Sequence, residues 1–206
     1  MRKITHVVNV GGVKVGGNNP IVVQSMTDTD TSDINKTVNQ IEELYNAGSE
    51  IVRVTVNNVE SAKAISKIKP ILSDKGINVP IIGDFHFIGH KILRTVPECA
   101  ENLDKYRINP GNLGSGNRKD DNFKTFIDIA KDLDKPVRIG VNAGSLDQEL
   151  LDLKMEENNR LRVPKSAEEV ESDALISSAI ISYQKAIAVS YTHLRAHETD
   201  SYLVCR

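Results

Sequence analysis

The sequence predicts an α/β protein built as an incomplete (β/α)8 TIM barrel, with about five parallel strands and an N-terminal β-hairpin. Strand-like and helix-like segments alternate five times at intervals of roughly 25–30 residues, which is typical of a parallel sheet. Polar side chains follow several strands at their carboxyl ends, where barrel enzymes place their chemistry. No Gly-x-Gly-x-x-Gly motif follows the first strand, which argues against an open dinucleotide-binding sheet. A complete barrel has eight strands and about 250 residues, so this chain of 206 residues is expected to form part of one.

The amino-terminal part of the chain predicts a hairpin followed by a buried strand. Two β-prone runs within residues 6–15 flank Gly11 and Gly12, and a glycine pair of this kind favours a tight turn. Residues 21–26 are expected to form the first strand of the main sheet, with the apolar composition of a buried strand. A polar loop over residues 27–32 then leads to the first helix.

Strands and helices are expected to alternate through the middle of the chain. The next strands are short runs rich in Val and Ile, at residues 51–56, 79–86, 105–109 and 137–141. The helices between successive strands are marked by apolar residues at helical spacing, which are Ile34, Val38, Ile41 and Leu44, then Ala62, Ile65, Ile68 and Leu72, then Ile92, Leu93, Val96 and Ala100, and finally Phe123, Phe126, Ile127 and Ala130. Ser32 or Asp33 can cap the first helix, and Gly48 and Gly76 can end the first two. Pro97 is expected to start or kink the third.

The carboxyl-terminal part of the chain changes character twice. A charged segment over residues 152–171 is expected to connect the last strand to a helix over residues 173–188. From Val189 onward the sequence shows no hydrophobic periodicity, and it resembles an adapter- or vector-derived tail that recurs at the ends of unrelated predicted proteins. The sequence therefore predicts a partial barrel domain over residues 1–188 and a non-native tail over residues 189–206. A native carboxyl-terminal tail is the alternative.

Composition narrows the classes of function. Lys and Arg number 26 against 28 Asp and Glu, so nothing indicates a nucleic-acid or anionic-membrane partner. No apolar run approaches the roughly 18 residues of a membrane span, and no apolar segment follows Met1 as a secretory signal would require. The two cysteines, Cys99 and Cys205, have no partner at metal-ligand spacing. We expect a cytoplasmic protein that holds no metal within this chain.

The strands place polar side chains on one face and aliphatic ones on the other, because successive strand residues point to opposite sides. With the aliphatic side toward the helices, the opposite side holds Gln24, Arg53, Asp84, His86, Arg107, Asn109, Arg138 and Asn142. Converging guanidinium groups are costly unless they are paired. Asp84 can neutralise one of them, and the remaining charge predicts a bound anion, for which a diphosphate is the natural candidate. The alternatives are that each Arg extends to the sheet rim or pairs with a loop carboxylate, or that Asp84 and His86 form a hydrogen-bonded core pair.

These residues lie in five motifs, which are Gln24-Ser25-Met26-Thr27, Val52-Arg53-Val54, Asp84-Phe85-His86-Phe87, Arg107-Ile108-Asn109-Pro110-Gly111-Asn112 and Arg138-Ile139-Gly140-Val141-Asn142-Ala143-Gly144-Ser145-Leu146. Together the motifs resemble the 4-hydroxy-3-methylbut-2-enyl diphosphate synthases of the methylerythritol phosphate route to isoprenoids. The resemblance is collinear over about residues 3–188. One difference is Phe85, where the family has Ile or Leu before the histidine.

The resemblance implies an iron–sulfur oxidoreductase whose barrel holds 2-C-methyl-D-erythritol 2,4-cyclodiphosphate. Its implied diphosphate-binding residues are Arg53, His86, Arg107, Asn109, Arg138 and Asn142, with Asp84 alongside. It also implies a homodimer, electrons from ferredoxin or flavodoxin, and a separate carboxyl-terminal domain whose [4Fe-4S] cluster is held by three Cys and a Glu. That domain and its ligands are absent from this sequence, so we expect no catalytic residue within the chain and no activity from the chain alone. The alternatives are a non-catalytic anion-binding module or another barrel enzyme for phosphorylated or pterin-like substrates.

Overall fold

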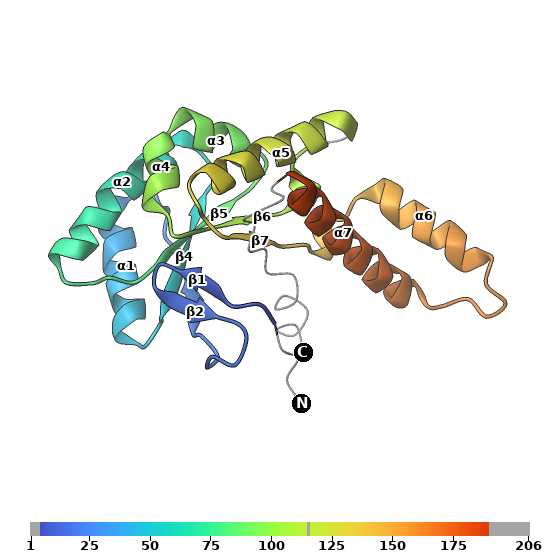
Figure 1. Cartoon of the computed structure of the whole chain (residues 1–206), viewed down its shortest axis with the longest axis horizontal. Coiled ribbons are helices and arrows are strands. Elements are labelled where there is room, and N and C mark those ends of the chain that lie inside the picture. Colours follow the sequence, from blue (N-terminus) through green and yellow to red (C-terminus); the bar gives the residue numbers. More distant parts are fainter. Residues whose placement is uncertain (1–4, 115, 190–206) are drawn as a thin grey trace.

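The strands form a two-stranded hairpin and a five-stranded parallel sheet in a computed structural model that describes residues 5–114 and 116–189 (Figure 1). The hairpin consists of β1 (Val8–Val10) and β2 (Val13–Val15). The sheet consists of β3 (Gln24–Met26), β4 (Ile51–Val56), β5 (Ile81–Phe85), β6 (Lys105–Ile108) and β7 (Val137–Ile139). Its spatial order repeats the chain order without reversal, so the sheet winds in one direction as a barrel does. Among the described residues the barrel is not closed, which confirms the predicted fold class.

Five helices cover one face of this sheet (Figure 1). They are α1 (Ile34–Asn46), α2 (Val59–Asp74), α3 (Gly89–Thr95), α4 (Pro97–Asn102) and α5 (Gly116–Asp132). Two short 3-10 turns, η1 (Pro110–Asn112) and η2 (Ala143–Ser145), follow β6 and β7. Two further helices, α6 (Gln148–Asn159) and α7 (Ala167–Val189), form a hairpin that extends beyond the sheet. None of the described helices has the length and apolar content needed to cross a membrane.

The core lies between the sheet and these five helices, as the alternation of strand residues predicts. The helix-facing residues of β4 to β7 are buried, and they include Val52, Val54, Val56, Ile108, Val137 and Ile139. Three aromatic rings form the centre of this core. Phe85 meets Tyr106 edge-on with ring centroids 5.8 Å apart, and Phe126 meets both rings at 5.5 and 5.8 Å. Because this side of the sheet is filled with apolar groups, polar strand residues are left to the other side.

The amino-terminal hairpin covers the opposite face of the sheet where the strands begin. A second apolar cluster contains Val8, Val10, Ile51 and Ile82. Gly11 has a φ of +55° and lies so close to Pro80 that a Cβ at position 11 would be 2.9 Å from the Pro80 Cβ. The hairpin therefore closes the amino-terminal end of the inner face and leaves the carboxyl ends of the strands open.

Most of the predicted helix boundaries are confirmed. Asp33 caps α1 by accepting a hydrogen bond from the Lys36 amide at 3.2 Å. Gly48 and Gly76 follow α1 and α2 with φ values of +99° and +73°, which glycine adopts without strain. The predicted third helix is divided into α3 and α4, because Pro97 takes the first position of a new helix.

The first main-sheet strand differs from its prediction. Residues 21–26 were expected to form a buried strand, but β3 spans only Gln24–Met26. Ile21 is 81% exposed and Val23 is 53% exposed. The reason is that β3 is an edge of the described sheet and pairs on one side only, with β4.

The prediction of a charged connector over residues 152–171 is also wrong. That range contains most of α6 and the beginning of α7. Asp147 caps α6 by accepting from the Glu149 amide at 3.1 Å, and Lys154 pairs with Glu157 along the helix. This helix is supported by its cap, by surface ion pairs and by packing against α7, and it has no clear apolar stripe. Residues 190–206, most of the segment interpreted as a non-native tail, lie outside the described residues.

Candidate anion-binding site

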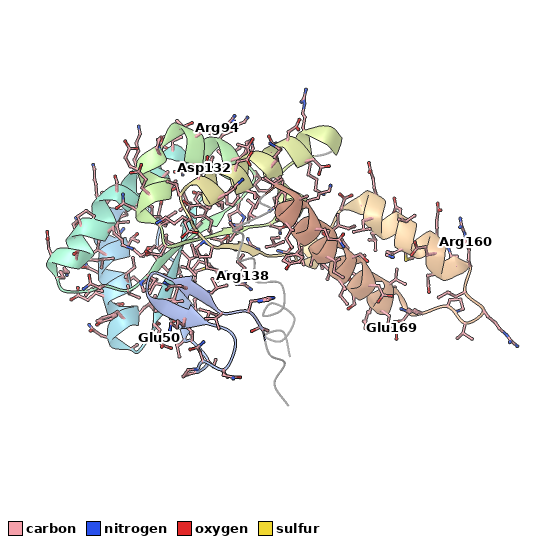
Figure 2. All side chains as sticks on the ribbon, viewed as in Figure 1. Glu50, Arg94, Asp132, Arg138, Arg160 and Glu169 are labelled. Atoms are coloured by element: carbon pink, nitrogen blue, oxygen red, sulfur yellow. The ribbon has the colours of Figure 1, made fainter. Side chains whose placement is uncertain are left out.

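The polar strand residues share the inner face of the sheet, opposite the helix-covered core. Asp84 on β5 stands in register with Arg107 on β6, and Arg107 stands in register with Arg138 on β7. Residues in register on parallel strands point to the same face. Figure 2 shows Arg138 on the side of β7 that faces away from α5. The expectation that these arginines lie on one face is therefore met by the strand register.

Asp84 lies at the centre of this group. Its side chain is 5% exposed and accepts a hydrogen bond from Nη1 of Arg107 at 2.9 Å. Nε of Arg53 lies 3.6 Å from its second carboxylate oxygen. Nε2 of His86 is 3.8 Å from the oxygen that Arg107 contacts, and the His86 side chain is 34% exposed. One carboxylate thus faces two guanidinium groups and an imidazole.

The charges in this cluster do not balance. Asp84 carries one negative charge, whereas Arg53 and Arg107 carry two positive charges whether or not His86 is protonated. The Arg53 side chain is 23% exposed and the Arg107 side chain 12%, so both are largely removed from water. Partly desolvated guanidinium groups with spare N–H donors suit the oxygens of an anion.

Gly140 follows β7 and allows the Arg107 side chain to take this position. A Cβ at position 140 would lie 2.6 Å from Nε of Arg107 and 3.0 Å from its Nη2. The guanidinium group therefore lies directly over the backbone of the next strand. A residue with any side chain at position 140 would force it to move.

Asn109 and Asn142 are joined through a residue that the sequence did not single out. Nδ2 of Asn109 donates to Oγ of Ser145 at 2.5 Å, and Ser145 donates to Oδ1 of Asn142 at 2.7 Å. Oδ1 of Asn109 accepts from the amide of Gly111 at 3.0 Å. Asn109 is 1% exposed, whereas Asn142 is exposed. The signal for Ser145 was its place in the motif that begins at Arg138, but only the fold shows that the loops after β6 and β7 meet.

Gln24 does not lie with this group. The register places it level with Ile51, at the beginning of β4, whereas Met26 is level with Arg53. Met26 is the β3 residue that contacts the cluster, with its sulfur 3.0 Å from Nη2 of Arg53. The other seven candidate residues lie on β4 to β7 or in the segments that follow β5 to β7.

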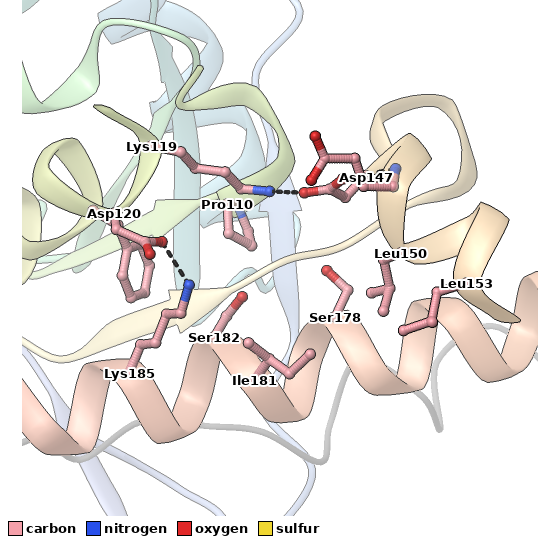
Figure 3. Close-up of a pocket in the computed structure, with 12 residues that line it drawn as sticks. Pro110, Lys119, Asp120, Asp147, Leu150, Leu153, Ser178, Ile181, Ser182 and Lys185 are labelled. Atoms are coloured by element: carbon pink, nitrogen blue, oxygen red, sulfur yellow. Dashed lines mark hydrogen bonds and ion pairs between the residues drawn. The ribbon is translucent and has the colours of Figure 1, made fainter. Parts of the chain in front are cut away.

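A separate cleft of about 560 Å³ lies between α5, α6 and α7 (Figure 3). Two ion pairs cross it, with Lys119 at 2.5 Å from Asp147 and Lys185 at 2.6 Å from Asp120. The hydrogen bond from Lys119 holds the pKa of Asp147 below its ordinary value. The arginine cluster does not line this cleft. The sequence did not predict it, because it depends on α6.

The residues described do not fit an iron–sulfur cluster. Within residues 5–114 and 116–189, no three His, Cys, Asp or Glu side chains gather in a way that could hold a metal. Cys99 is completely buried, and burial raises the pKa of its thiol to about 12. It lies on the buried face of α4 as a core residue, which is the usual place of a thiol in apolar surroundings.

Fold and side-chain placement together define a (β/α)-barrel domain that gathers arginine side chains where its parallel strands end. A family model of the GcpE TIM-barrel domain matches residues 5–197 of the sequence. The chain therefore belongs to the GcpE family, an enzyme family of isoprenoid biosynthesis. The match confirms the membership that the five motifs indicated, and it runs past residue 188, where the sequence predicts the barrel to end.

Two solved structures resemble this fold. Dihydropteroate synthase from Burkholderia cenocepacia, complexed with 7,8-dihydropteroate, aligns over 95% of this chain with a TM-score of 0.52 and 12% sequence identity. This chain spans 64% of the length of that protein. Dihydropteroate synthase from Xanthomonas albilineans aligns over 98% of this chain and 95% of its own length, with a TM-score of 0.48 and 11% identity. At these identities the likeness to the first structure concerns the fold alone.

Proposed function

We propose that this chain is the substrate-binding barrel of a 4-hydroxy-3-methylbut-2-enyl diphosphate synthase, and that it holds the diphosphate of 2-C-methyl-D-erythritol 2,4-cyclodiphosphate. The observation that carries the proposal is the arrangement around Asp84, where one carboxylate faces the guanidinium groups of Arg53 and Arg107. The surplus positive charge suits an anion, and membership of the GcpE family supports a cyclic diphosphate as that anion.

In this proposal the chain binds and orients the substrate. Arg107 and Arg53 donate to phosphate oxygens, and Asp84 holds the two guanidinium groups in place through its ion pairs with them. Arg138 joins them from β7, beside Arg107. His86, at the exposed edge of the cluster, donates a further hydrogen bond when it is protonated. Phosphate oxygens are hydrogen-bond acceptors, so each of these groups contacts the ligand as a donor.

The redox half of the reaction is assigned to residues outside those described here. The family's [4Fe-4S] cluster would supply the redox chemistry of the ring opening, and its ligands would lie in a separate carboxyl-terminal domain. We propose that a homodimer brings that domain over the barrel, that ferredoxin or flavodoxin is the electron donor, and that the reaction takes place in the cytoplasm. The 206-residue chain alone is proposed to bind without turnover.

Isothermal titration calorimetry of the full chain with inorganic pyrophosphate tests the binding half. We expect saturable binding, and we expect Arg107→Ala to weaken it about tenfold or more, since a hydrogen bond to a charged group contributes about 1.5–3 kcal/mol. Arg160→Ala is the matched control. Arg160 lies at the far end of α6 and is 80% exposed, so its loss should leave pyrophosphate affinity unchanged (Figure 2).

The same titration separates this proposal from the anion-binding module. A module of that kind would bind inorganic phosphate and pyrophosphate with similar affinity, and it would not bind the cyclic substrate more tightly than either. A synthase barrel should prefer 2-C-methyl-D-erythritol 2,4-cyclodiphosphate to both. Equal effects of Arg107→Ala and Arg160→Ala would argue against any specific site. Sequencing the gene downstream of codon 188 tests the redox half, and no Cys-x-x-Cys with a third Cys in frame would count against it.

A further inference from the structure

We infer that Ser145 is a positioning residue that fixes which end of the Asn142 carboxamide meets the ligand, so that this side chain offers N–H donors to a diphosphate. The inference rests on the proposed function for the identity of the ligand. It rests on four hydrogen-bonding groups in the loops after β6 and β7 for the direction of the amide.

The direction is set at Gly111, whose backbone N–H can only donate. It donates to the Asn109 side chain at 3.0 Å, so the atom it meets must be the carbonyl oxygen. Rotation of the Asn109 carboxamide would put two donors face to face. Asn109 is 1% exposed, and an unsatisfied pair of donors there would have no water to relieve it.

The amide nitrogen of Asn109 is thereby turned toward Ser145. It donates to Oγ of Ser145 at 2.5 Å. A serine hydroxyl has one proton to give, and Ser145 gives it to the Asn142 side chain at 2.7 Å. The atom that receives this proton is Oδ1 of Asn142. The series therefore runs from Gly111 to Asn109, from Asn109 to Ser145 and from Ser145 to Asn142.

The remaining group is the amide nitrogen of Asn142. Among residues 5–114 and 116–189 it has no hydrogen-bond partner in the structure, and Asn142 is exposed at the carboxyl end of β7. Asn142 lies two residues after Gly140 in extended conformation, with φ −147° and ψ 162°, so both residues belong to the face that carries Arg107. The series therefore ends in two N–H donors on the face of the sheet that carries Arg107. Diphosphate oxygens accept and do not donate, so this is the complementary orientation.

The two loops are held at a fixed separation by their backbones. A Cβ at position 111 would lie 1.8 Å from the carbonyl oxygen of Ser145 and 3.0 Å from its carbonyl carbon. Glycine at 111 lets the turn after β6 rest directly on the turn after β7. The distance that Ser145 spans between Asn109 and Asn142 is thus set by main-chain contact and not by flexible side chains.

The first test examines the unliganded full chain. In side-chain amide NMR spectra, the Asn109 and Asn142 NH2 signals should both shift in Ser145→Ala and should stay near their wild-type positions in Ser145→Thr, which keeps the hydroxyl. Ser66→Ala removes a hydroxyl that bonds within α2 and should move neither signal. Unchanged Asn109 and Asn142 signals in Ser145→Ala would overturn the inference, even if the chain binds no pyrophosphate.

The second test is a double-mutant cycle in pyrophosphate affinity, measured by calorimetry. Ser145→Ala should weaken binding about fivefold to tenfold, the effect of losing one hydrogen bond, and Ser145→Thr should restore it. Because Ser145 acts through Asn142, adding Ser145→Ala to Asn142→Ala should cost nothing more. Fully additive losses would overturn the positioning role. A wild-type chain that binds no pyrophosphate would instead refute the proposed function, while the spectra still decide the role of Ser145.

Discussion

Gly140 and Arg107 approach each other so closely that no side chain fits between them. The ideal Cβ position of residue 140 is 2.6 Å from Nε of Arg107, a distance that real Cβ atoms do not reach. The guanidinium group that binds Asp84 therefore packs directly against the backbone of Gly140. The glycine is required here by space and not by its own backbone angles.

Gly140→Ala should move the Arg107 guanidinium and break its 2.9 Å contact with Asp84. Since the displaced atoms belong to a flexible side chain, we expect about 1–2 kcal/mol of lost stability and a clear loss of pyrophosphate affinity. Calorimetry and thermal melting measure both. Gly144→Ala is the control, because its nearest neighbour, Oδ1 of Asn142, is 3.8 Å away. Equal behaviour of the two variants would contradict the steric explanation.

Asp84→Asn should lower the free energy of unfolding by about 2–3 kcal/mol, because it leaves two partly desolvated guanidinium groups without their counter-charge. Pyrophosphate should restore more stability to this variant than to the wild type, since it supplies the missing negative charge. Thermal melts with and without pyrophosphate give the comparison. Asp173→Asn, which breaks an exposed pair with Lys165, should change stability by less than about 1 kcal/mol. If the Asp84→Asn variant is as stable as the wild type and its melting temperature does not rise with pyrophosphate, the cluster does not bind anions as proposed.

His90 should make folding stability depend on pH. It is 6% exposed, neither ring nitrogen has a hydrogen-bond partner in the part of the chain that is described, and its pKa is lowered by burial and then by the charges of Lys91 and Arg94. Unfolded His90 therefore binds a proton more readily than folded His90. Stability is complete above the unfolded pKa of about 6.5 and declines as the pH falls from there toward the lower folded pKa.

His90→Leu should remove this pH dependence and raise the unfolding free energy at pH 5 by about 1 kcal/mol or more, because an unsatisfied buried polar group is eliminated. Denaturant titrations at a series of pH values measure the effect. His6→Gln is the control, because His6 is exposed. If wild type and His90→Leu lose stability in parallel below pH 6.5, another group is responsible.

Cys99 should be unreactive in the folded chain. Its pKa is raised to about 12 by burial, so almost no thiolate is present at neutral pH. In a Cys205→Ser variant, a thiol reagent should label Cys99 only after denaturation. Rapid labelling of the native chain would show that α4 opens readily, and it would reopen Cys99 as a chemically active residue.

The exposed segment just before β3 should promote association through the sheet edge. Ile21 is 81% exposed beside an edge strand, and apolar edges pair with other chains. Ile21→Lys is expected to increase the monomer fraction in size-exclusion chromatography. Val163→Lys is the control, because Val163 is 79% exposed but lies in the α6–α7 connection, away from the sheet. An equal gain from both would indicate general stickiness and not edge pairing.

The sequence predicts the parts of this molecule that depend on local chemistry. Helix caps such as Asp33 and stops such as Gly48 act within a few residues, and the alternation around Arg53, Arg107 and Arg138 follows from strand geometry alone. The five strands and the arginines on the inner face of the sheet could therefore be predicted from the sequence. The contact between Arg53 and Asp84 follows once neighbouring strands are placed in order.

What the sequence could not show depends on contacts between distant segments. The role of Ser145 requires the loops after β6 and β7 to touch. Asn109 and Ser145 are 36 positions apart in the sequence, and nothing between them indicates this contact. The exposure of Ile21 follows from its position at an edge, which composition does not reveal. Helix α6 has no clear apolar stripe, so a search for helical periodicity does not detect it.

The order β3-β4-β5-β6-β7 also bears on how the chain folds during synthesis. Each strand pairs with the one made just before it, so a strand leaving the ribosome always finds its partner already present. The sheet can then grow one βα unit at a time, with short loops to close. The amino-terminal hairpin is the exception. It is made first, yet its apolar face can be buried only after Ile51 and Ile82 have been made, so that face stays exposed during the interval.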